Sequence, residues 1–457
     1  MNLRNQTSRI VHWIFVLLFS SISLLYLSCS GAQSTESSPS EQPDSDSVYS
    51  LPPSIQQEWV TLRAQDGRSS WGVLYLPKDK KPQTAILAMH PRGNQSRNSF
   101  FLPLVEAGFA AFGHNNRYLN NDRDGIHEHM LLDIAAGVSF LKGRGFEKIV
   151  LLGQSGGGSL MAFYQAQAVT KPPGRVSSTP AGDPPDLNEF NLPPGDGLLL
   201  VIPHIGEGKI LEMRIDPSVS KEGDPLSIDP SLDMFNPANG FRFPPENTTY
   251  SQEFIARYLE GQRARMARLD SWALDAIEEQ NRYKGLIEKP DFKNLPPAQQ
   301  QLIERHSNTA GMMTIYRTWA DLRYMDLGID PSDRTVGENS GTTPWLANYS
   351  RSPSPVYISP RAFLSTRSSI SSNAVSVENL PQVRVPLLIV QGTAHRAIYP
   401  SETQALFEAA GSEDKELVWI VGGDVSFNPS GPKAGKGDQR QQSVDAIVSW
   451  MLERFPH

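Results

Sequence analysis

One short segment combines a serine with closely spaced glycines, Gly153-Gln154-Ser155-Gly156-Gly157. It directly follows the apolar run Ile149-Val150-Leu151-Leu152, which is typical of a strand buried on both faces, and it precedes a predicted helix at Leu160–Ala168. Glycines on a sharp strand-to-helix turn let two backbones approach where a Cβ atom would clash. The segment therefore predicts that Ser155 is an exposed nucleophile whose oxyanion faces the N–H groups that begin the helix.

Other polar clusters do not have the spacing of a metal or phosphate site. Asn120–Gly125 is rich in oxygen ligands but lacks the twelve-residue calcium pattern and its glutamate. His127-Glu128-His129 lacks the i, i+4 spacing of zinc-binding histidines. No Gly-Lys-Ser/Thr follows the glycine-rich turn, and no G-x-G-x-x-G is present. We therefore expect no metal and no cofactor.

The elements that must position Ser155 alternate between strands and helices. Trp59–Leu62 and Gly72–Leu76, separated by Asp66-Gly67, predict an antiparallel pair of strands at the start. Further buried strands are followed by helical stretches, which is typical of a parallel sheet covered by helices. These further segments are, as strands, Ala85–Met89, Phe109–Phe112, Leu198–Ile202, Leu387–Val390 and Leu417–Val421, and, as helices, Phe100–Ala107, Leu131–Leu141, Ser401–Ala410 and Val444–Phe455.

Between the strand at Leu198–Ile202 and about Pro386 the alternation stops. Apolar residues at helical intervals predict a helix across Phe254–Ile277 and a second one at about Ala298–Leu322, separated by prolines. A helical insertion after a central strand is typical of a cap over an active site.

Together these motifs resemble the α/β-hydrolase superfamily, from about Trp59 to the C-terminus. The resemblance implies an α/β fold with a mostly parallel central sheet flanked by helices and a helical cap insertion. It also implies an oxyanion loop at His90-Pro91-Arg92-Gly93. Because Pro91 has no N–H, the expected backbone donors to the oxyanion are Arg92 and Gly156.

The resemblance further implies an acid after a late strand and a histidine after the last strand. The first of these segments reads Gly392-Thr393-Ala394-His395, with a histidine in the place of the acid. The second reads Gly422-Gly423-Asp424-Val425-Ser426-Phe427, with Val425 in the place of the histidine. We therefore expect His395 and Asp424 to serve Ser155 as base and acid.

Two alternatives remain open, because a serine without a base is a weak nucleophile. In one, the base is His204, which follows the strand at Leu198–Ile202, or it is His127 or His129, in the loop before the predicted helix at Leu131–Leu141. In the other, the fold keeps the turn but has lost efficient hydrolysis, and the protein binds a ligand or a partner.

The N-terminus carries the features of an export signal. Arg4 and Arg9 precede an apolar stretch from Trp13 to Leu27, which is too short to span a bilayer comfortably. Cys29 is the only cysteine, and its place at the end of the signal resembles the lipobox of bacterial lipoproteins. This implies a lipidated Cys29 and a membrane-anchored protein of the cell envelope, with a plain cleaved signal or a retained anchor as alternatives.

The expected organisation is a signal peptide at 1–28, a lipidated flexible tether at 29–54, hydrolase core at 55–204 and 384–457, and a cap at 205–383. The tether is expected because the segment is polar and rich in serine and proline. A net charge of −7 argues against a nucleic-acid partner. The expected function is a serine hydrolase that cleaves an ester, thioester or amide bond of a small molecule.

Overall fold

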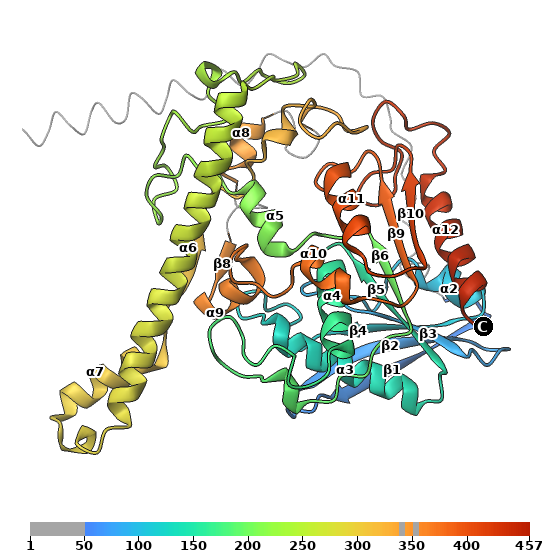
Figure 1. Ribbon diagram of the computed structural model, residues 1–457, viewed down its shortest axis with the longest axis horizontal. Coiled ribbons are helices and arrows are strands. Elements are labelled where there is room, and N and C mark those ends of the chain that lie inside the picture. Colours follow the sequence, from blue (N-terminus) through green and yellow to red (C-terminus); the bar gives the residue numbers. More distant parts are fainter. Residues whose placement is uncertain (1–50, 338–342, 351–355) are drawn as a thin grey trace, which may run out of the picture. The chain divides into compact units, whose positions relative to one another are not determined.

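The computed structural model describes residues 51–337, 343–350 and 356–457. Within this part, the unit from Pro52 to His457 is built around one sheet of eight strands in the order β1-β2-β4-β3-β5-β6-β9-β10 (Figure 1). β2 runs antiparallel to both of its neighbours, and the strands from β4 to β10 pair in parallel. The strands are β1 Ile55–Arg63, β2 Ser69–Pro77, β3 Thr84–Ala88, β4 Ala110–Asn115, β5 Lys148–Gln154, β6 Gly197–Val201, β9 Leu387–Gly392 and β10 Lys415–Ile420.

Helices cover both faces of this sheet. One face is covered by α2 and α12, and the other by α3, α4 and α11. The central strands β3, β5 and β6 are apolar along most of their length and buried, because helices lie on both of their sides. The sheet topology and the two helical layers are those of the α/β-hydrolase fold, as predicted. The covering helices are α2 Phe101–Glu106, α3 His127–Gly143, α4 Gly156–Val169, α11 Pro400–Ala409 and α12 Gln439–Arg454.

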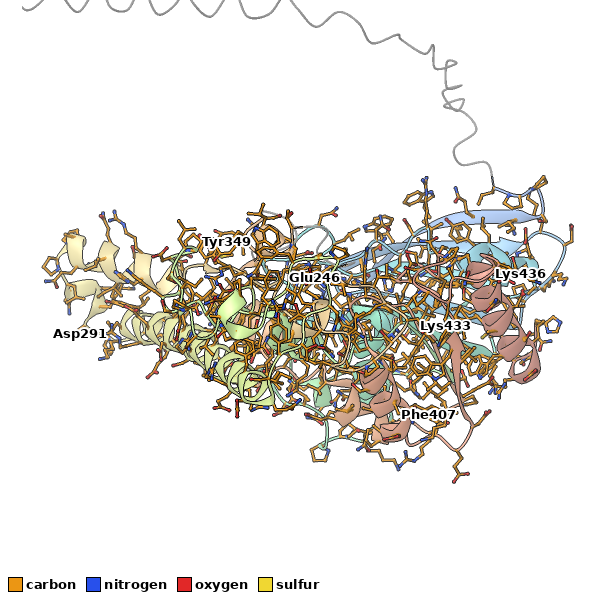
Figure 2. All side chains as sticks on the ribbon, turned by 90° about the horizontal axis from the view of Figure 1, so that it is seen from above. Glu246, Asp291, Tyr349, Phe407, Lys433 and Lys436 are labelled. Carbon is orange, nitrogen blue, oxygen red and sulfur yellow. The ribbon has the colours of Figure 1, made fainter. Side chains whose placement is uncertain are left out.

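The segment between β6 and β9 contributes no strand to the large sheet. Its longest element is α6, which the sequence predicted correctly from Phe254 to Ile277 and which packs against α7 (Figure 1). Asp291 lies at the connection between these two helices, on the opposite side of the unit from Lys433 and Lys436 (Figure 2). The main elements are α5 Glu207–Arg214, α6 Gln252–Ile287, α7 Pro297–Asn308, β7 Met313–Ile315, α8 Pro344–Ala347, β8 Val356–Ile358, α9 Pro360–Ala362 and α10 Ser376–Asn379.

The predicted second helix of this segment was too long. α7 ends at Asn308, Thr309 is already extended, and Gly311 has a positive φ of 75° that no helix accommodates. The following residues form β7, which pairs antiparallel with β8. Ile315 and Leu322, which the prediction placed on the helix, are buried, so their spacing came from a short strand and a loop.

His127 and His129 also lie elsewhere than expected. They belong to the first turn of α3 and not to a loop before it. In the described residues, no helix has both the length and the apolar character that crossing a bilayer requires. Cys29 and the predicted signal and most of the predicted tether lie outside the described residues.

Candidate active site

Ser155 lies on the strained turn that the sequence predicts between β5 and α4. Its φ of 54° and ψ of −122° belong to a region that residues with a side chain rarely adopt. Its N–H donates to the carbonyl of Val201 at 2.9 Å, and its carbonyl accepts from the N–H of Gly158 at 2.9 Å. These two bonds attach the turn to β6 on one side and to α4 on the other.

Three glycines make this turn sterically possible. A Cβ atom at Gly153 would lie 2.5 Å from the carbonyl oxygen of Gly157, and one at Gly157 would lie 2.6 Å from the carbonyl oxygen of Met89. At Gly158 it would lie 2.6 Å from the Cβ of Pro203. Each distance is far inside van der Waals contact, so the backbones of three strand ends meet only because these side chains are absent.

His204 is the histidine that contacts the serine. The register pairs Gln154 with Val201, so the residues that follow β5 and β6 emerge side by side at one edge of the sheet. The Nε2 atom of His204 lies 2.9 Å from the Oγ atom of Ser155. The His204 N–H also donates to the carbonyl of Ser155 at 3.0 Å, and its carbonyl accepts from the Ser376 hydroxyl at 2.8 Å. The imidazole is thus held against the serine by its own backbone.

Burial lowers the pKa of His204 well below its ordinary value, and the nearby Glu207 carboxylate opposes this effect only in part. The ring is therefore neutral at pH 7 and can accept a proton on Nε2. Its Nδ1 atom is buried and has no hydrogen-bond partner among the described residues. Ser155 and His204 consequently form a dyad, without a carboxylate bonded to the far side of the ring.

A buried carboxylate lies against the same turn. Glu207, the first residue of α5, is 2% exposed, and its Oε1 atom pairs with the Arg92 guanidinium at 2.5 Å. The other carboxylate oxygen, Oε2, lies 3.8 Å from Nε2 of His127. A Cβ at Gly156 would lie 2.7 Å from Oε1, so the carboxylate touches the backbone that follows Ser155. Burial alone would raise the pKa of Glu207, but the guanidinium groups of Arg92 and Arg367 hold it below its usual range.

The predicted oxyanion donors are in different situations. The N–H of Gly156 is the first of α4 and has no acceptor within the helix. The N–H of Arg92 donates to Nδ1 of His90 at 3.0 Å, and that of Gly93 donates to the same atom at 2.7 Å. The Arg92 N–H is therefore engaged inside its own loop. Burial lowers the pKa of His90 to about 4, so the ring is neutral and, with Nδ1 accepting, carries its proton on Nε2.

His395 and Asp424 make contacts within their own loops. Nδ1 of His395 accepts from the N–H groups of Ala397 and Ile398 at 3.1 and 2.8 Å, and Nε2 is buried without a hydrogen-bond partner among the described residues. Burial lowers the pKa of this ring to about 3. The Asp424 carboxylate accepts from the backbone N–H groups of Ser426 and Asn428, each at 2.7 Å. Neither side chain hydrogen-bonds to Ser155 or to the other, and their catalytic roles stay a prediction.

The other two candidate histidines also contact groups away from the serine. The Nδ1 atom of His129 lies 2.6 Å from the Tyr118 hydroxyl. Both ring nitrogens of His127 are buried without a hydrogen bond among the described residues, and burial lowers the pKa of the ring to about 4. Its nearest charged group is Glu207. Within the described ranges, no cluster of three or more His, Cys, Asp or Glu side chains could hold a metal ion.

A cavity of about 230 Å³ opens beside the dyad. Its lining combines the imidazole of His204 and the carboxylate of Glu207 with three arginines and an apolar wall. The arginines are Arg92, Arg214 and Arg367, and the wall is formed by Ile210, Leu211, Trp319 and Val356, with Thr318 beside it. The core contributes one side of this cavity and the segment between β6 and β9 contributes the other.

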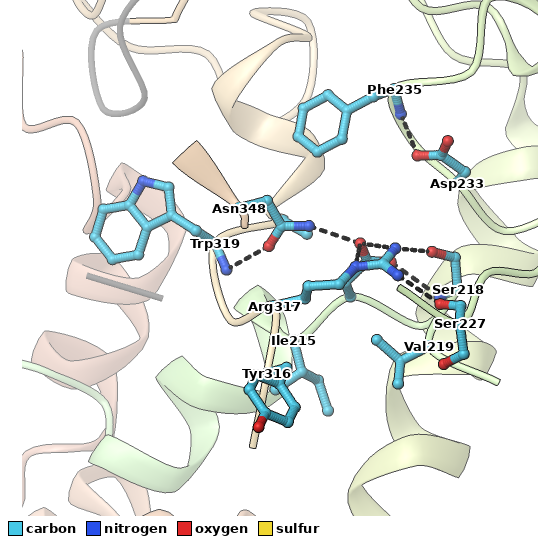
Figure 3. A network of polar contacts seen from close by, with 12 residues as sticks. Ile215, Ser218, Val219, Ser227, Asp233, Phe235, Tyr316, Arg317, Trp319 and Asn348 are labelled. Carbon is cyan, nitrogen blue, oxygen red and sulfur yellow. Dashed lines mark hydrogen bonds and ion pairs between the residues drawn. The ribbon is translucent and has the colours of Figure 1, made fainter. Parts of the chain in front are cut away.

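The wall at Thr318 and Trp319 is fixed by the buried polar network of Figure 3. The Arg317 guanidinium donates to Oδ2 of Asp216 at 3.0 and 2.6 Å, to the carbonyl of Ser227 at 2.7 Å and to the hydroxyl of Ser218. Asn348 donates to the same carboxylate at 2.7 Å, and its amide oxygen accepts from the N–H of Trp319 at 3.1 Å. The segment that lines the cavity is therefore anchored on both sides of Thr318.

Sequence reasoning did not single out Glu207, Arg214 and Arg367. A short-range signal existed for Glu207, because it follows His204 by three residues and begins a helix. Arg214 and Arg367 come from separate turns of the segment between β6 and β9, and only the tertiary structure brings them to one cavity.

The sequence matches no protein-family model, and the comparison with curated proteins found no match. Among solved structures, the chain is similar to the esterase domain of a Rhodothermus marinus protein, with 10% identity over 87% of this chain and 98% of that one and a TM-score of 0.40. It is also similar to DcsB in complex with its substrate analogue, with 15% identity, coverage of 88% and 99%, and a TM-score of 0.45. Est1E from Butyrivibrio proteoclasticus is similar as well, with 13% identity over 87% of this chain and 98% of that one and a TM-score of 0.40. The strand order of the sheet itself assigns the chain to the α/β-hydrolase fold.

Proposed function

We propose that this protein is a serine hydrolase that cleaves an ester, thioester or amide bond of a small substrate. Ser155 is the nucleophile and His204 is its general base. The observation that carries the proposal is the 2.9 Å contact between Oγ of Ser155 and Nε2 of His204 on a nucleophile turn. A neutral imidazole in hydrogen-bond contact with the hydroxyl is the arrangement that activates a serine.

In the acylation step, His204 takes the hydroxyl proton while Oγ of Ser155 attacks the carbonyl carbon. The N–H of Gly156, at the start of α4, faces the developing oxyanion. The protonated ring then gives its proton to the departing alcohol, thiol or amine, and an acyl-serine remains. In deacylation, His204 takes a proton from water, and the water oxygen attacks the acyl carbon. The ring then returns the proton to Oγ of Ser155, and the acid is released.

Glu207 supports the charged form of the base. Its carboxylate raises the pKa of His204 against the effect of burial, so it stabilises the imidazolium that forms during attack. Because Nδ1 of His204 has no bonded carboxylate, ring orientation depends on its backbone contacts with Ser155 and Ser376. Glu207 acts here as a positioning and electrostatic residue and not as the third member of a hydrogen-bonded triad.

A fluorophosphonate probe tests the proposal, because it reacts with an activated serine. We expect the wild-type protein to be labelled at pH 7.5 and Ser155→Ala not to be labelled. Ser159→Ala is the matched control, because its hydroxyl bonds to the Gly156 carbonyl within α4 and does not contact His204. A folded wild-type protein that remains unlabelled would overturn the hydrolase proposal and favour the alternative of a binding protein.

We also propose that the mature protein is attached to a membrane through a lipid on Cys29. The support is the signal-like N-terminus and its single cysteine. In a host that processes lipoproteins, the wild-type chain is expected in the membrane fraction and Cys29→Ala in the soluble fraction. Membrane attachment that is unchanged in Cys29→Ala would contradict the lipid anchor.

A further inference from the structure

The cavity beside the dyad carries more positive than negative charge. Three guanidinium groups, from Arg92, Arg214 and Arg367, line it together with a single carboxylate, that of Glu207. The carboxylate is paired with Arg92 at 2.5 Å. Because the neighbouring histidine His204 is neutral, the lining has a formal charge of +2.

Neither of the two other arginines forms a direct ion pair in the described part of the chain, although the Glu207 and Asp122 carboxylates act on Arg367 from farther away. Arg214 donates to the carbonyl of Ala397 at 2.7 Å, and its guanidinium lies 5.4 Å from the centre of the Trp319 ring. Stacking on an aromatic ring restrains the guanidinium without neutralising it. Arg367 forms no direct ion pair and no hydrogen bond among the described residues, although its side chain is partly buried. Its position is nevertheless defined, since it ends a π-helical turn, Phe363–Arg367; such turns are frequent at functional sites.

The electrostatic surroundings of Arg367 disfavour its positive charge. Burial lowers its pKa to about 10, with repulsion from Arg92 as the next contribution, and attraction to Glu207 and Asp122 opposes these effects only in part. The guanidinium therefore remains charged at pH 7 while its environment disfavours that charge. A half-buried cation of this kind is stabilised when an anion enters and accepts its hydrogen bonds.

The rest of the lining limits what can carry this anion. Ile210, Leu211 and Val356 form an apolar surface next to the guanidinium groups. The cavity of about 230 Å³ is smaller than the pockets that hold drug-sized ligands. It therefore accommodates a short apolar body that ends in a compact charged group.

We infer that the cavity lined by Arg214 and Arg367 is an oxyanion-binding subsite, so that the substrate is an ester, thioester or amide whose small acyl or leaving part ends in a carboxylate or phosphate group. The inference rests on the proposed function, because the cavity borders His204, the base of the dyad. Arg367 supplies a guanidinium whose N–H groups form no hydrogen bond among the described residues and can receive the anion, and Arg214, stacked on Trp319, supplies the second.

The test compares matched charged and uncharged ligands. For hydrolysis, the pair is the 4-nitrophenyl monoester of adipic acid, which ends in a carboxylate, and 4-nitrophenyl hexanoate, which does not. We expect the ratio of kcat/KM for the charged over the uncharged ester to exceed 1 and to fall about 10- to 100-fold in Arg367→Gln, the loss typical of a charge-assisted hydrogen bond. Arg367→Lys keeps the charge and is expected to lose less. Arg263→Gln, an exposed arginine of α6, is the matched control and leaves the ratio unchanged.

A binding measurement separates this inference from the hydrolase proposal. Calorimetry on Ser155→Ala, which needs no chemistry, is expected to show adipate binding more tightly than adipamide, with the preference lost in Ser155→Ala combined with Arg367→Gln. Adipate preference without hydrolysis by the wild-type protein would support the subsite and overturn the hydrolase. Hydrolysis of both esters at equal kcat/KM, with equal binding of adipate and adipamide, would overturn the subsite and leave the hydrolase. If Arg367→Gln does not fold, Arg214→Gln provides the same comparison.

Discussion

The loops after β5 and β6 and the loops after β9 and β10 lie at the same edge of the sheet. Each pair carries a histidine, and the two histidines form different contacts. After β5 and β6, the Nε2 atom of His204 faces Oγ of Ser155 at 2.9 Å. After β9, His395 has its Nδ1 occupied by two N–H groups of its own loop. Asp424, after β10, likewise accepts from its own loop. A ring nitrogen that already accepts backbone hydrogen bonds orients a loop, whereas one that faces a hydroxyl can take its proton.

The two histidines are not distinguished by their ionisation. Burial lowers the pKa of both rings, so both are neutral at pH 7. What separates them is the direction of the nitrogen lone pair, which the local backbone decides. The position of a titratable residue at the edge of a parallel sheet therefore makes it a candidate catalytic residue. Whether it can act as a base depends on which of its ring nitrogens is not already bonded to the backbone of its own loop.

Removing each histidine in turn is expected to have very different effects on catalysis. His204→Ala is expected to lower kcat/KM for 4-nitrophenyl hexanoate by about 10⁴-fold or more, because a serine without its base loses most of its reactivity. His395→Ala is the counterpart and is expected to stay within about tenfold of the wild type. Steady-state kinetics and the rate of fluorophosphonate labelling measure both. A large loss of kcat/KM in His395→Ala together with an active His204→Ala would identify His395, in the β9 loop, as the base.

A second prediction compares glycines of the two regions. Gly157→Ala would bring a Cβ atom to 2.6 Å from the carbonyl oxygen of Met89, so we expect it to lower the free energy of unfolding by about 3 kcal/mol or more. Gly423→Ala, in the β10 loop, would meet the Ile420 side chain at 3.1 Å and is expected to cost about 1 kcal/mol. Gly143→Ala, with nothing within 4 Å, is the control. Urea unfolding measures all three, and equal losses at Gly157 and Gly423 would contradict the close approach at the serine turn.

A third prediction concerns pH. The pKa of His395 is about 3 in the folded chain, so the unfolded chain binds a proton near pH 6.5 that the folded chain does not. Stability contributed by this ring is present above pH 6.5 and is lost as pH falls toward 3. His395→Asn keeps an acceptor for the two N–H groups and removes the titration. The difference in unfolding free energy between pH 7 and 4.5 is expected to shrink by on the order of 2 kcal/mol. An unchanged difference would show that His395 titrates normally in the folded chain.

The smallest expected effect is at Asp424. Asp424→Asn keeps the oxygen that accepts the two N–H groups, so kcat/KM is expected to remain within about twofold of the wild type and the free energy of unfolding within about 0.5 kcal/mol. Kinetics and urea unfolding on the same preparation check both values. A loss of a hundredfold or more in kcat/KM would give this carboxylate the role of the catalytic acid after all.

Much of the fold could be predicted from local patterns. Hydrophobic periodicity correctly places the apolar runs of β3, β5 and β6, the antiparallel pair β1 and β2, and α6 as far as Ile277. α7 was predicted too long because buried residues of a short strand, β7, mimic helical spacing. Periodicity reports burial, and it does not distinguish a helix from a strand that is followed by a packed loop.

For the candidate site, local sequence was enough to predict the turn at Ser155, because a strand, closely spaced glycines and a helix are contiguous in the chain. Which histidine faces Ser155 could be seen only in the folded chain. His204 reaches Ser155 through the pairing of β5 with β6, and Arg214 and Arg367 reach the cavity from distant turns. The physical reason is that a side chain's contacts depend on the direction in which its loop leaves the sheet, which no local pattern of residue types records.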